Sequence, residues 1–315
     1  MSFAANVREE LSRQTARTRH CRTAELAAML FFGGILRIGE TGEMTLEFRS
    51  EQAAAQETFL QLLRRLFRVT PDGISPSARE RAGASACTIC LTDQDAVTKI
   101  LTAVGTLNED GELNEERPLT EQDILKRECC RRAFLRGAFL TSGTVSDPNR
   151  SYHLEFLCNS EEQREQLRQL LGAAGIPAGG VRRGRKELVY LKDGSRIADL
   201  LGLMEAPVSL LAFENARIMR EVRGNINRKV NCETSNIRKT ADAAAGQIAD
   251  VKLIEKMIGF SELPRALDET ARIRLQYPTA TLQELGELLE PPVGKSGINH
   301  RMRKLHVIAE QLRKD

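Results

Sequence analysis

The side chains best suited to contacting a nucleic acid lie near the end of the chain, in one segment with helical periodicity. Apolar residues recur there every three or four positions, at Ile298, Met302, Leu305, Ala309 and Leu312. At about 100 degrees per residue, the opposite face carries polar side chains, namely Asn299, His300, Arg303 and Lys304. Asn and Arg form paired hydrogen bonds with the edges of adenine and guanine. The segment therefore predicts a helix that packs by one face and contacts DNA by the other, with Lys295, Ser296 and Arg301 also in the interface.

Two shorter helices are expected to hold this helix in place. The first is predicted over 265–275 and ends at a Tyr-Pro pair, because the residue before proline avoids the α conformation. Thr281 and Glu284 have the spacing of a capping box, which opens the second. Two prolines end that helix, and Ser296 is expected to be the N-cap of the last one. This order predicts a helix-turn-helix at about 280–313.

A cluster of cationic residues precedes this motif within 217–249. Its members are Arg217, Arg220, Arg223, Arg228, Lys229, Arg238 and Lys239. Several asparagines are interleaved with them, and cations with amide donors suit phosphate oxygens. We expect Arg228 and Lys229 to bind DNA phosphates, and the alternative is a solvated, charged connector.

The first two hundred residues contain an internal repeat. The tripeptide Leu-Glu-Phe at 46–48 recurs at 154–156, each time in an alternating run that predicts a strand. An apolar helical stretch that ends in glycine precedes each copy, over 24–34 and 131–143. A Ser-Glu pair, a helix, a further strand and an amphipathic helix follow both times. We therefore expect two α/β halves packed as a pseudo-symmetric pair.

Small residues in the second of these helices, Ala133, Gly137 and Ala138, would allow another helix to approach closely. Paired helices of this kind, each opening an α-β-β repeat, resemble those of the LAGLIDADG homing-endonuclease fold. In that family each paired helix ends in an acidic residue that holds a catalytic divalent metal. The resemblance places Gly33 and Ser142 at these two positions.

Neither of those residues supplies a carboxylate, so we expect no catalytic residue, no bound metal and no cofactor. The nearest acids, Glu40 and Asp147, lie along the following loops. A metal-dependent nuclease that uses these acids is the enzymatic alternative. Without catalysis, this half is either a second surface that contacts DNA or a scaffold that binds proteins.

Composition limits the remaining possibilities. With 315 residues the chain is long enough for more than one domain, and 46 basic against 43 acidic residues give a net charge of +3, which does not by itself indicate nucleic acid. No run of eighteen apolar residues and no signal-peptide core is present, so we expect a cytoplasmic protein without a membrane partner. Seven irregularly placed cysteines favour reduced thiols, and Cys87 and Cys90 lie in a predicted strand without further zinc ligands.

Three long motifs point to one family. They are Gly-Asn-Ile-Asn-Arg-Lys-Val-Asn-Cys-Glu-Thr-Ser-Asn at 224–236, Pro-Val-Gly-Lys-Ser-Gly-Ile-Asn-His-Arg at 292–301, and Arg-Gly-Ala-Phe-Leu at 136–140 followed by Ser-Tyr-His-Leu-Glu at 151–155. All resemble the WhiA family of Gram-positive bacteria. The resemblance implies an inactive LAGLIDADG-like domain joined to a C-terminal helix-turn-helix. It also implies a role in transcription linked to sporulation, cell division and chromosome segregation.

The expected fold class is α+β, with a duplicated α-β-β domain and an all-α C-terminal domain. The first is predicted over 1–216, with repeats at about 20–110 and 128–216; a basic linker over 217–249 and a DNA-binding domain over 250–315 follow. We expect a nucleoid-associated, sequence-specific regulator that binds double-stranded DNA and has no enzymatic activity. A sigma factor or second regulator is a further candidate partner, which a scaffold would recruit.

Overall fold

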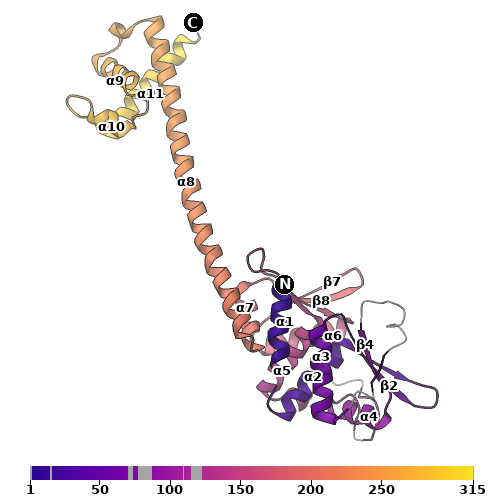
Figure 1. Ribbon diagram of the computed structural model, residues 1–315. Helices are drawn as coiled ribbons and strands as arrows, with labels where there is room; N and C mark the ends of the chain where they lie inside the picture. The colour runs from indigo at the N-terminus through magenta and orange to yellow at the C-terminus, as the bar shows by residue number, and fades with distance from the viewer. Residues whose placement is uncertain are drawn as a thin grey trace. The chain divides into compact units, whose positions relative to one another are not determined.

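The computed structural model describes residues 2–14, 16–69, 74–76, 87–108, 110–114 and 123–314. The chain forms two compact units, Met1–Arg220 and Glu221–Asp315, and each is considered by itself (Figure 1). Among the described residues, no helix combines the length and the apolar character needed to cross a membrane.

The first unit contains two copies of one sequence of elements. The first copy runs α2 (Arg19–Gly33), β1 (Gly34–Ile38), β2 (Met44–Ser50), α3 (Ala53–Phe67), β3 (Ile74–Pro76), β4 (Cys87–Leu91) and α4 (Gln94–Ala103). The second runs α5 (Glu128–Ser142), β5 (Gly143–Val145), β6 (Leu154–Cys158), α6 (Glu161–Ala173), β7 (Gly179–Arg183), β8 (Lys186–Leu191) and α7 (Gly194–Leu203). An N-terminal helix, α1 (Phe3–Arg13), and a short turn of 3-10 helix, Asp123–Leu125, lie outside the repeats.

The two antiparallel sheets have the same topology and equivalent registers. Their strand orders are β1-β2-β4-β3 and β5-β6-β8-β7. Gly34 pairs with Phe48 in the first sheet, and Gly143 pairs with Phe156 in the second. In both copies the residue directly after the long helix thus lies opposite the aromatic residue of the repeated tripeptide. The predicted fold class, with its duplicated α-β-β plan, is confirmed.

Helices α2 and α5 pack against each other at the centre of this unit. A Cβ atom at Gly137 would lie 2.4 Å from the carbonyl oxygen of Glu25 and 3.1 Å from the Cβ of Ala28. Only glycine fits at this crossing, which offsets the cost of about 1 kcal/mol for glycine inside a helix. The prediction that small residues allow a close helix approach is therefore confirmed.

Two local features differ from the sequence expectation. Helix α1 was not predicted, and its buried Ala4, Val7 and Leu11 face the core, where α1 packs on α3 and α5. The Ser-Glu pair at 50–51 does not open a helix, because Ser50 ends β2 and α3 begins only at Ala53. In the second repeat Ser160 does cap its helix, accepting a hydrogen bond from the Gln163 amide.

The second unit is entirely helical in its regular structure. It comprises the later part of α8 (Pro207–Met257), the 3-10 turn Phe260–Glu262, α9 (Arg265–Gln276), α10 (Leu282–Glu287) and α11 (Lys295–Leu312). Helix α8 is continuous through 217–249, so the basic segment is regular helix rather than an irregular connection. The domain boundaries at 216 and 249 stay predictions.

Candidate nucleic-acid interface

Helix α11 is fixed by its apolar face. Ile298, Met302, Leu305 and Ala309 are buried in the core of the second unit, where α11 packs on α9 and α10. Leu312 is half-buried against the same core. The predicted core stripe is therefore confirmed, and it determines which face of α11 is turned outward.

The capping box at the start of α10 is present with both of its hydrogen bonds. The Glu284 amide donates to Thr281 Oγ1 at 3.3 Å, and the Thr281 amide donates to Glu284 Oε2 at 2.7 Å. The backbone and hydroxyl hydrogen bonds from Thr281 lower the pKa of the Glu284 carboxyl. Helix α10 thus begins where the sequence predicts.

The turn between α10 and α11 depends on a close backbone contact. The Val293 amide donates to the Gly286 carbonyl at 2.9 Å, and a Cβ atom at Gly286 would lie 1.9 Å from the Val293 carbonyl oxygen. No larger residue fits there without moving the backbone. Gly286 therefore sets the approach of the turn to α10, a role that the sequence analysis did not identify.

A buried arginine closes the turn between α9 and α10. Arg274 is 2% exposed, and its Nη1 donates to the Ala280 carbonyl at 2.7 Å. Burial lowers the pKa of this guanidinium, because the charged form loses its water. Arg274 thus holds the loop between α9 and α10 in place.

Two further polar contacts join α11 to its neighbours. Asp250 of α8 is buried, and it pairs with His306 Nδ1 at 2.7 Å and Arg313 Nη2 at 2.6 Å. Arg301 Nη1 donates to the Ala266 carbonyl and to Thr270 Oγ1, both at 3.2 Å. Arg301, which we predicted to contact DNA, therefore already has partners on α9.

The start of α11 differs from the prediction. The N-cap is Gly294, without a side-chain capping bond, and Lys295 is the first helical residue. The prediction that Ser296 is the N-cap is therefore wrong. The helix begins at Lys295, one residue before Ser296, because the backbone of Gly294 already has the extended conformation of an N-cap. Ser296 lies instead in the exposed first turn.

The polar face of α11 is divided between solvent and α8. Exposed positions are Lys295, Ser296, His300, Arg303 and Lys304. Asn299 is only half-buried, and with Arg303 it lines a hollow of about 410 Å³ beside 243–250 of α8. Asn299, which the sequence places on the polar face, is thus less exposed than its neighbours on that face, because it lies at the side of the helix next to α8.

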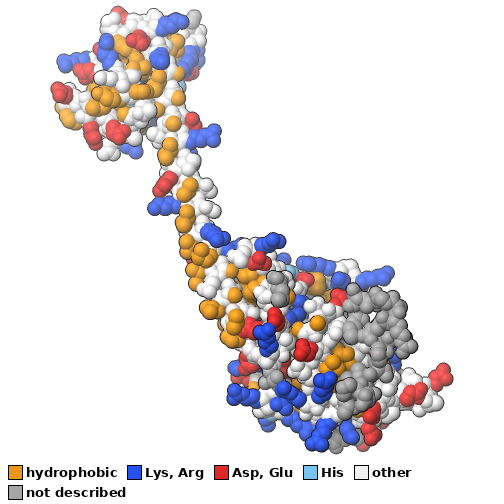
Figure 2. Space-filling view, viewed as in Figure 1, with side chains coloured by type: hydrophobic (Ala, Val, Ile, Leu, Met, Phe, Trp, Pro, Cys, Tyr) orange, Lys and Arg blue, Asp and Glu red, His pale blue; other side chains and the backbone are white. Residues whose placement is uncertain are grey.

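The cations of α8 also fall into two groups. Arg217 Nη1 pairs with Glu214 Oε1 at 2.6 Å, and Arg220 lies 4.5 Å from the Tyr152 ring centroid, so both are used within the first unit. Arg228 and Lys229 are exposed, and Arg228 Nη2 donates to Asn225 Oδ1 at 2.6 Å. Figure 2 shows the blue side chains of this helix interspersed with orange hydrophobic ones.

In the first unit, Gly33 and Ser142 end α2 and α5, where the resemblance to the homing-endonuclease fold would place carboxylates, and neither residue carries one. A Cβ atom at Gly33 would lie 2.8 Å from the Arg49 carbonyl oxygen and 2.8 Å from Phe48 Cε2. The Ser142 hydroxyl donates to the Ala138 carbonyl at 3.1 Å. Asp147 accepts hydrogen bonds from the amide and the side chain of Asn149, which lower the pKa of its carboxyl.

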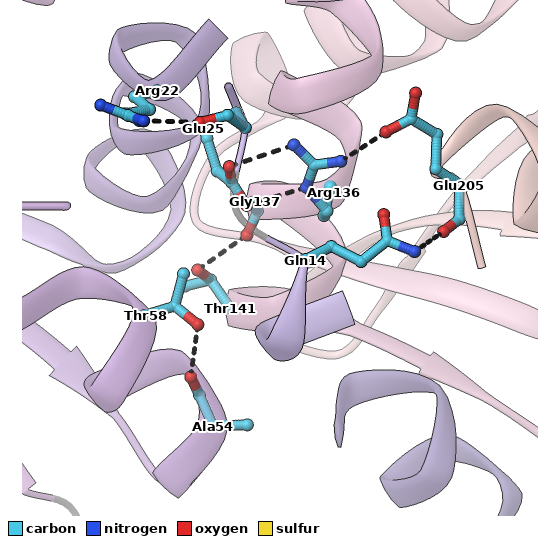
Figure 3. Close-up of polar contacts among 10 residues, drawn as sticks. Gln14, Arg22, Glu25, Ala54, Thr58, Arg136, Gly137, Thr141 and Glu205 are labelled. Atoms are coloured by element: carbon cyan, nitrogen blue, oxygen red, sulfur yellow. Dashed lines mark hydrogen bonds and ion pairs between the residues drawn. The ribbon is translucent and has the colours of Figure 1, made fainter. Parts of the chain in front are cut away.

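A buried ion pair between Arg136 of α5 and Glu25 of α2 holds these two helices together. Arg136 is 3% exposed; its Nε donates to Glu25 Oε1 at 2.9 Å, and its Nη1 donates to Glu205 Oε2 at 3.0 Å (Figure 3). Burial raises the pKa of the Glu25 carboxyl, and the Arg136 charge opposes that effect. A removed partner would leave an uncompensated buried charge, so this is a structural contact.

Comparison with protein families assigns all three parts of the chain. Residues 19–105 match the WhiA N-terminal LAGLIDADG-like domain, residues 131–223 the WhiA LAGLIDADG-like domain, and residues 226–309 the WhiA C-terminal HTH domain. Together these matches span most of the sequence.

Individual proteins agree with these matches. The chain is 40% identical over 310 residues to the "Probable cell division protein WhiA" of Heliobacterium modesticaldum, covering 98% of this chain and 96% of that protein. It is 38% identical over 316 residues to the protein of the same name in Clostridium acetobutylicum, covering 100% and 99%. The crystal structure of full-length DUF199/WhiA from Thermatoga maritima shares the fold, with a TM-score of 0.59 at 23% identity over 99% of both chains.

Proposed function

We propose that this chain, which belongs to the WhiA family, is a sequence-specific, DNA-binding transcriptional regulator of cell division, chromosome segregation and sporulation, without nuclease activity. Its relatives are named as probable cell division proteins, and its last part matches a helix-turn-helix domain. Its ligand would be chromosomal DNA, so we expect it in the cytoplasm at the nucleoid.

The exposed face of α11 carries the proposal. Ser296, His300 and Lys304 lie outward while the opposite face is buried, and the first turns of a recognition helix are where base contacts occur. Arg303 is also exposed and has the donor geometry that pairs with guanine. Asn299 and Arg301 would contribute less to base recognition than their residue types suggest. Asn299 lies beside α8, and Arg301 already donates a hydrogen bond to α9.

Phosphate contacts would come from a different set of side chains. Lys295 lies at the N-terminus of α11, and Arg228 and Lys229 lie on the exposed part of α8. Such contacts position a protein on DNA and make affinity depend on salt, but they carry no sequence preference. We therefore assign sequence preference to α11 and general affinity to these cations.

The test begins with genome-wide mapping of bound sites, which supplies a cognate duplex. We expect His300→Ala and Arg303→Ala to melt like the unchanged protein and to lose about 1–3 kcal/mol of binding to that duplex for each base contact removed. Met302→Ala is the matched control on the buried face, and it should lower stability by about 2–5 kcal/mol. If both exposed-face variants keep full preference for the cognate over a scrambled duplex, α11 does not recognise the sequence.

The absence of nuclease activity is supported by the positions of Gly33 and Ser142, which offer no carboxylate for a divalent metal. We expect no cleavage of plasmid DNA with magnesium or manganese. Metal-dependent cleavage that disappears in Asp147→Ala or in a Glu40 variant would instead support the enzymatic alternative.

A further inference from the structure

Four metal-ligating side chains meet where α2 and α5 begin. They are His20, Cys21, Cys129 and Cys130, and their ligand atoms all lie within 4.8 Å of one another. His20 Nδ1 is 3.1 Å from Cys130 Sγ and 3.3 Å from Cys21 Sγ. This cluster is separate from Gly33 and Ser142, which lie at the opposite ends of the same two helices.

The geometry fits one tetrahedral zinc ion. Zinc bonds of about 2.3 Å to sulfur and about 2.0–2.1 Å to nitrogen place the four ligand atoms of a tetrahedron about 3.5–3.8 Å apart. The separations in the cluster bracket this range, so small side-chain rotations would bring all four atoms into place. Three sulfurs and one nitrogen form a closed ligand set, which is typical of structural zinc.

The internal repeat supplies an independent argument. Helices α2 and α5 are each 15 residues long, and both are followed directly by a glycine that starts a strand. His20 and Cys21 are the second and third residues of α2, as Cys129 and Cys130 are of α5. Each repeat therefore contributes the same two positions to the cluster.

The surroundings favour thiolates once a cation is present. Neither helix has a side-chain capping bond at its N-terminus, and the cluster residues lie in the first turn of each helix, where the partial positive charge of the helix dipole favours thiolates. Cys129 is exposed, and Cys129, His20 and Cys21 line a hollow of about 650 Å³ through which an ion can enter.

We propose that His20, Cys21, Cys129 and Cys130 bind one zinc ion that joins the two repeats of the first unit. On binding, the three thiols release their protons to the solvent, the neutral imidazole of His20 donates its Nδ1 lone pair, and nothing is oxidised. The ion connects positions that are distant in sequence and stabilises the folded unit, because the unfolded chain holds no preformed site. Soft thiolate ligands select zinc over magnesium, so the site is not a nuclease centre.

The full-length protein, purified under reducing conditions without chelator, tests the proposal. We expect about one zinc per chain by elemental mass spectrometry. Replacement by cobalt(II) should give the sulfur-to-metal charge-transfer absorption and the strong visible bands of a tetrahedral thiolate site. Removing the ion with a chelator should lower the melting temperature of the first unit, and added zinc should restore it.

Variants separate this site from adventitious binding. Cys129→Ser alters the exposed ligand and should fold, yet it should bind zinc at least about tenfold more weakly, while Cys21→Ser with Cys130→Ser should hold no zinc. Cys232→Ser, at an exposed thiol on α8 outside the cluster, is the matched control and should retain the full zinc content. Zinc-free protein after reconstitution, unchanged zinc in Cys129→Ser, or a disulfide within the cluster in the reduced protein would each overturn the proposal.

Discussion

The most direct test of the helix-turn-helix geometry is the addition of a single methyl group at Gly286. In Gly286→Ala the new Cβ would lie 1.9 Å from the Val293 carbonyl oxygen, far inside the 3.4 Å at which ordinary contact begins. No side chain can rotate away, since the clash is with backbone. The turn must shift, and the hydrogen bond from the Val293 amide to the Gly286 carbonyl, now 2.9 Å, would break.

The expected cost follows from these two changes. Overpacking costs about 1–3 kcal/mol and a broken hydrogen bond about 1 kcal/mol, against a gain of about 1 kcal/mol from replacing glycine in a helix. The net loss in the free energy of unfolding is about 1–3 kcal/mol. For a domain of 60–100 residues, each kcal/mol lost lowers the melting temperature by about 4–8 °C. DNA binding should weaken as well, because the turn sets the position of α11.

The matched control is Gly246→Ala on α8, where no atom beyond the neighbouring residues and the backbone of the helix itself lies within 4 Å of the added Cβ. The same substitution there should raise stability by up to about 1 kcal/mol, since only helix propensity changes. The assay is thermal unfolding followed by circular dichroism, combined with hydrogen exchange of the Val293 amide. If Gly286→Ala melts with the unchanged protein and the Val293 amide stays protected, the close approach at Gly286 does not determine the turn.

Three further outcomes can be measured on the same protein. Replacing Arg228 and Lys229 together with alanine should make the salt dependence of DNA affinity shallower by about one unit for each bound phosphate that is released, whereas Arg217→Ala, whose side chain pairs with Glu214, should leave the slope unchanged. Gly33→Asp should lower the melting temperature of the first unit without creating cleavage, because its Cβ meets backbone at 2.8 Å; normal stability with magnesium-dependent cleavage would contradict this. Because Thr281 lowers the pKa of Glu284 below its ordinary 4.5, the capping contribution should be complete above pH 4.5 and decline as the pH falls through the folded-state pKa. The stability difference between the unchanged protein and Glu284→Gln should therefore shrink under acid in paired melting curves, and a constant difference would show that this carboxylate is not the capping group.

The sequence could predict those features that depend on local periodicity and short-range hydrogen bonds. The stripe from Ile298 to Ala309 is buried, the Thr281 capping box forms, and the repeated tripeptides occupy equivalent strands. Each of these follows from side chains a few residues apart. Ser296 failed as an N-cap because backbone conformation at Gly294, which residue type does not specify, decides where the helix starts.

Contacts between distant segments could not be predicted in the same way. The pairing of Asp250 with His306 and Arg313 depends on how α8 lies against α11, and nothing in either segment indicates the other. The same holds for Arg301, whose partners on α9 are 31 and 35 positions away. One signal for the thiol cluster was present, because His20-Cys21 and Cys129-Cys130 occupy equivalent places in the two repeats.

The beginnings and the ends of α2 and α5 differ in which residue types the two repeats place at matching positions. At the beginnings of α2 and α5, both repeats carry ligating side chains at matching positions, and these side chains converge. At the ends, the matching positions hold Gly33 and Ser142, and tight packing around Gly33 leaves no space for a side chain. A nuclease of this fold needs carboxylates at the ends, whereas a metal at the beginnings would only join the repeats. A chain of this fold could therefore lack cleavage and still keep the paired helices, because stability and catalysis would depend on opposite ends of the same two helices.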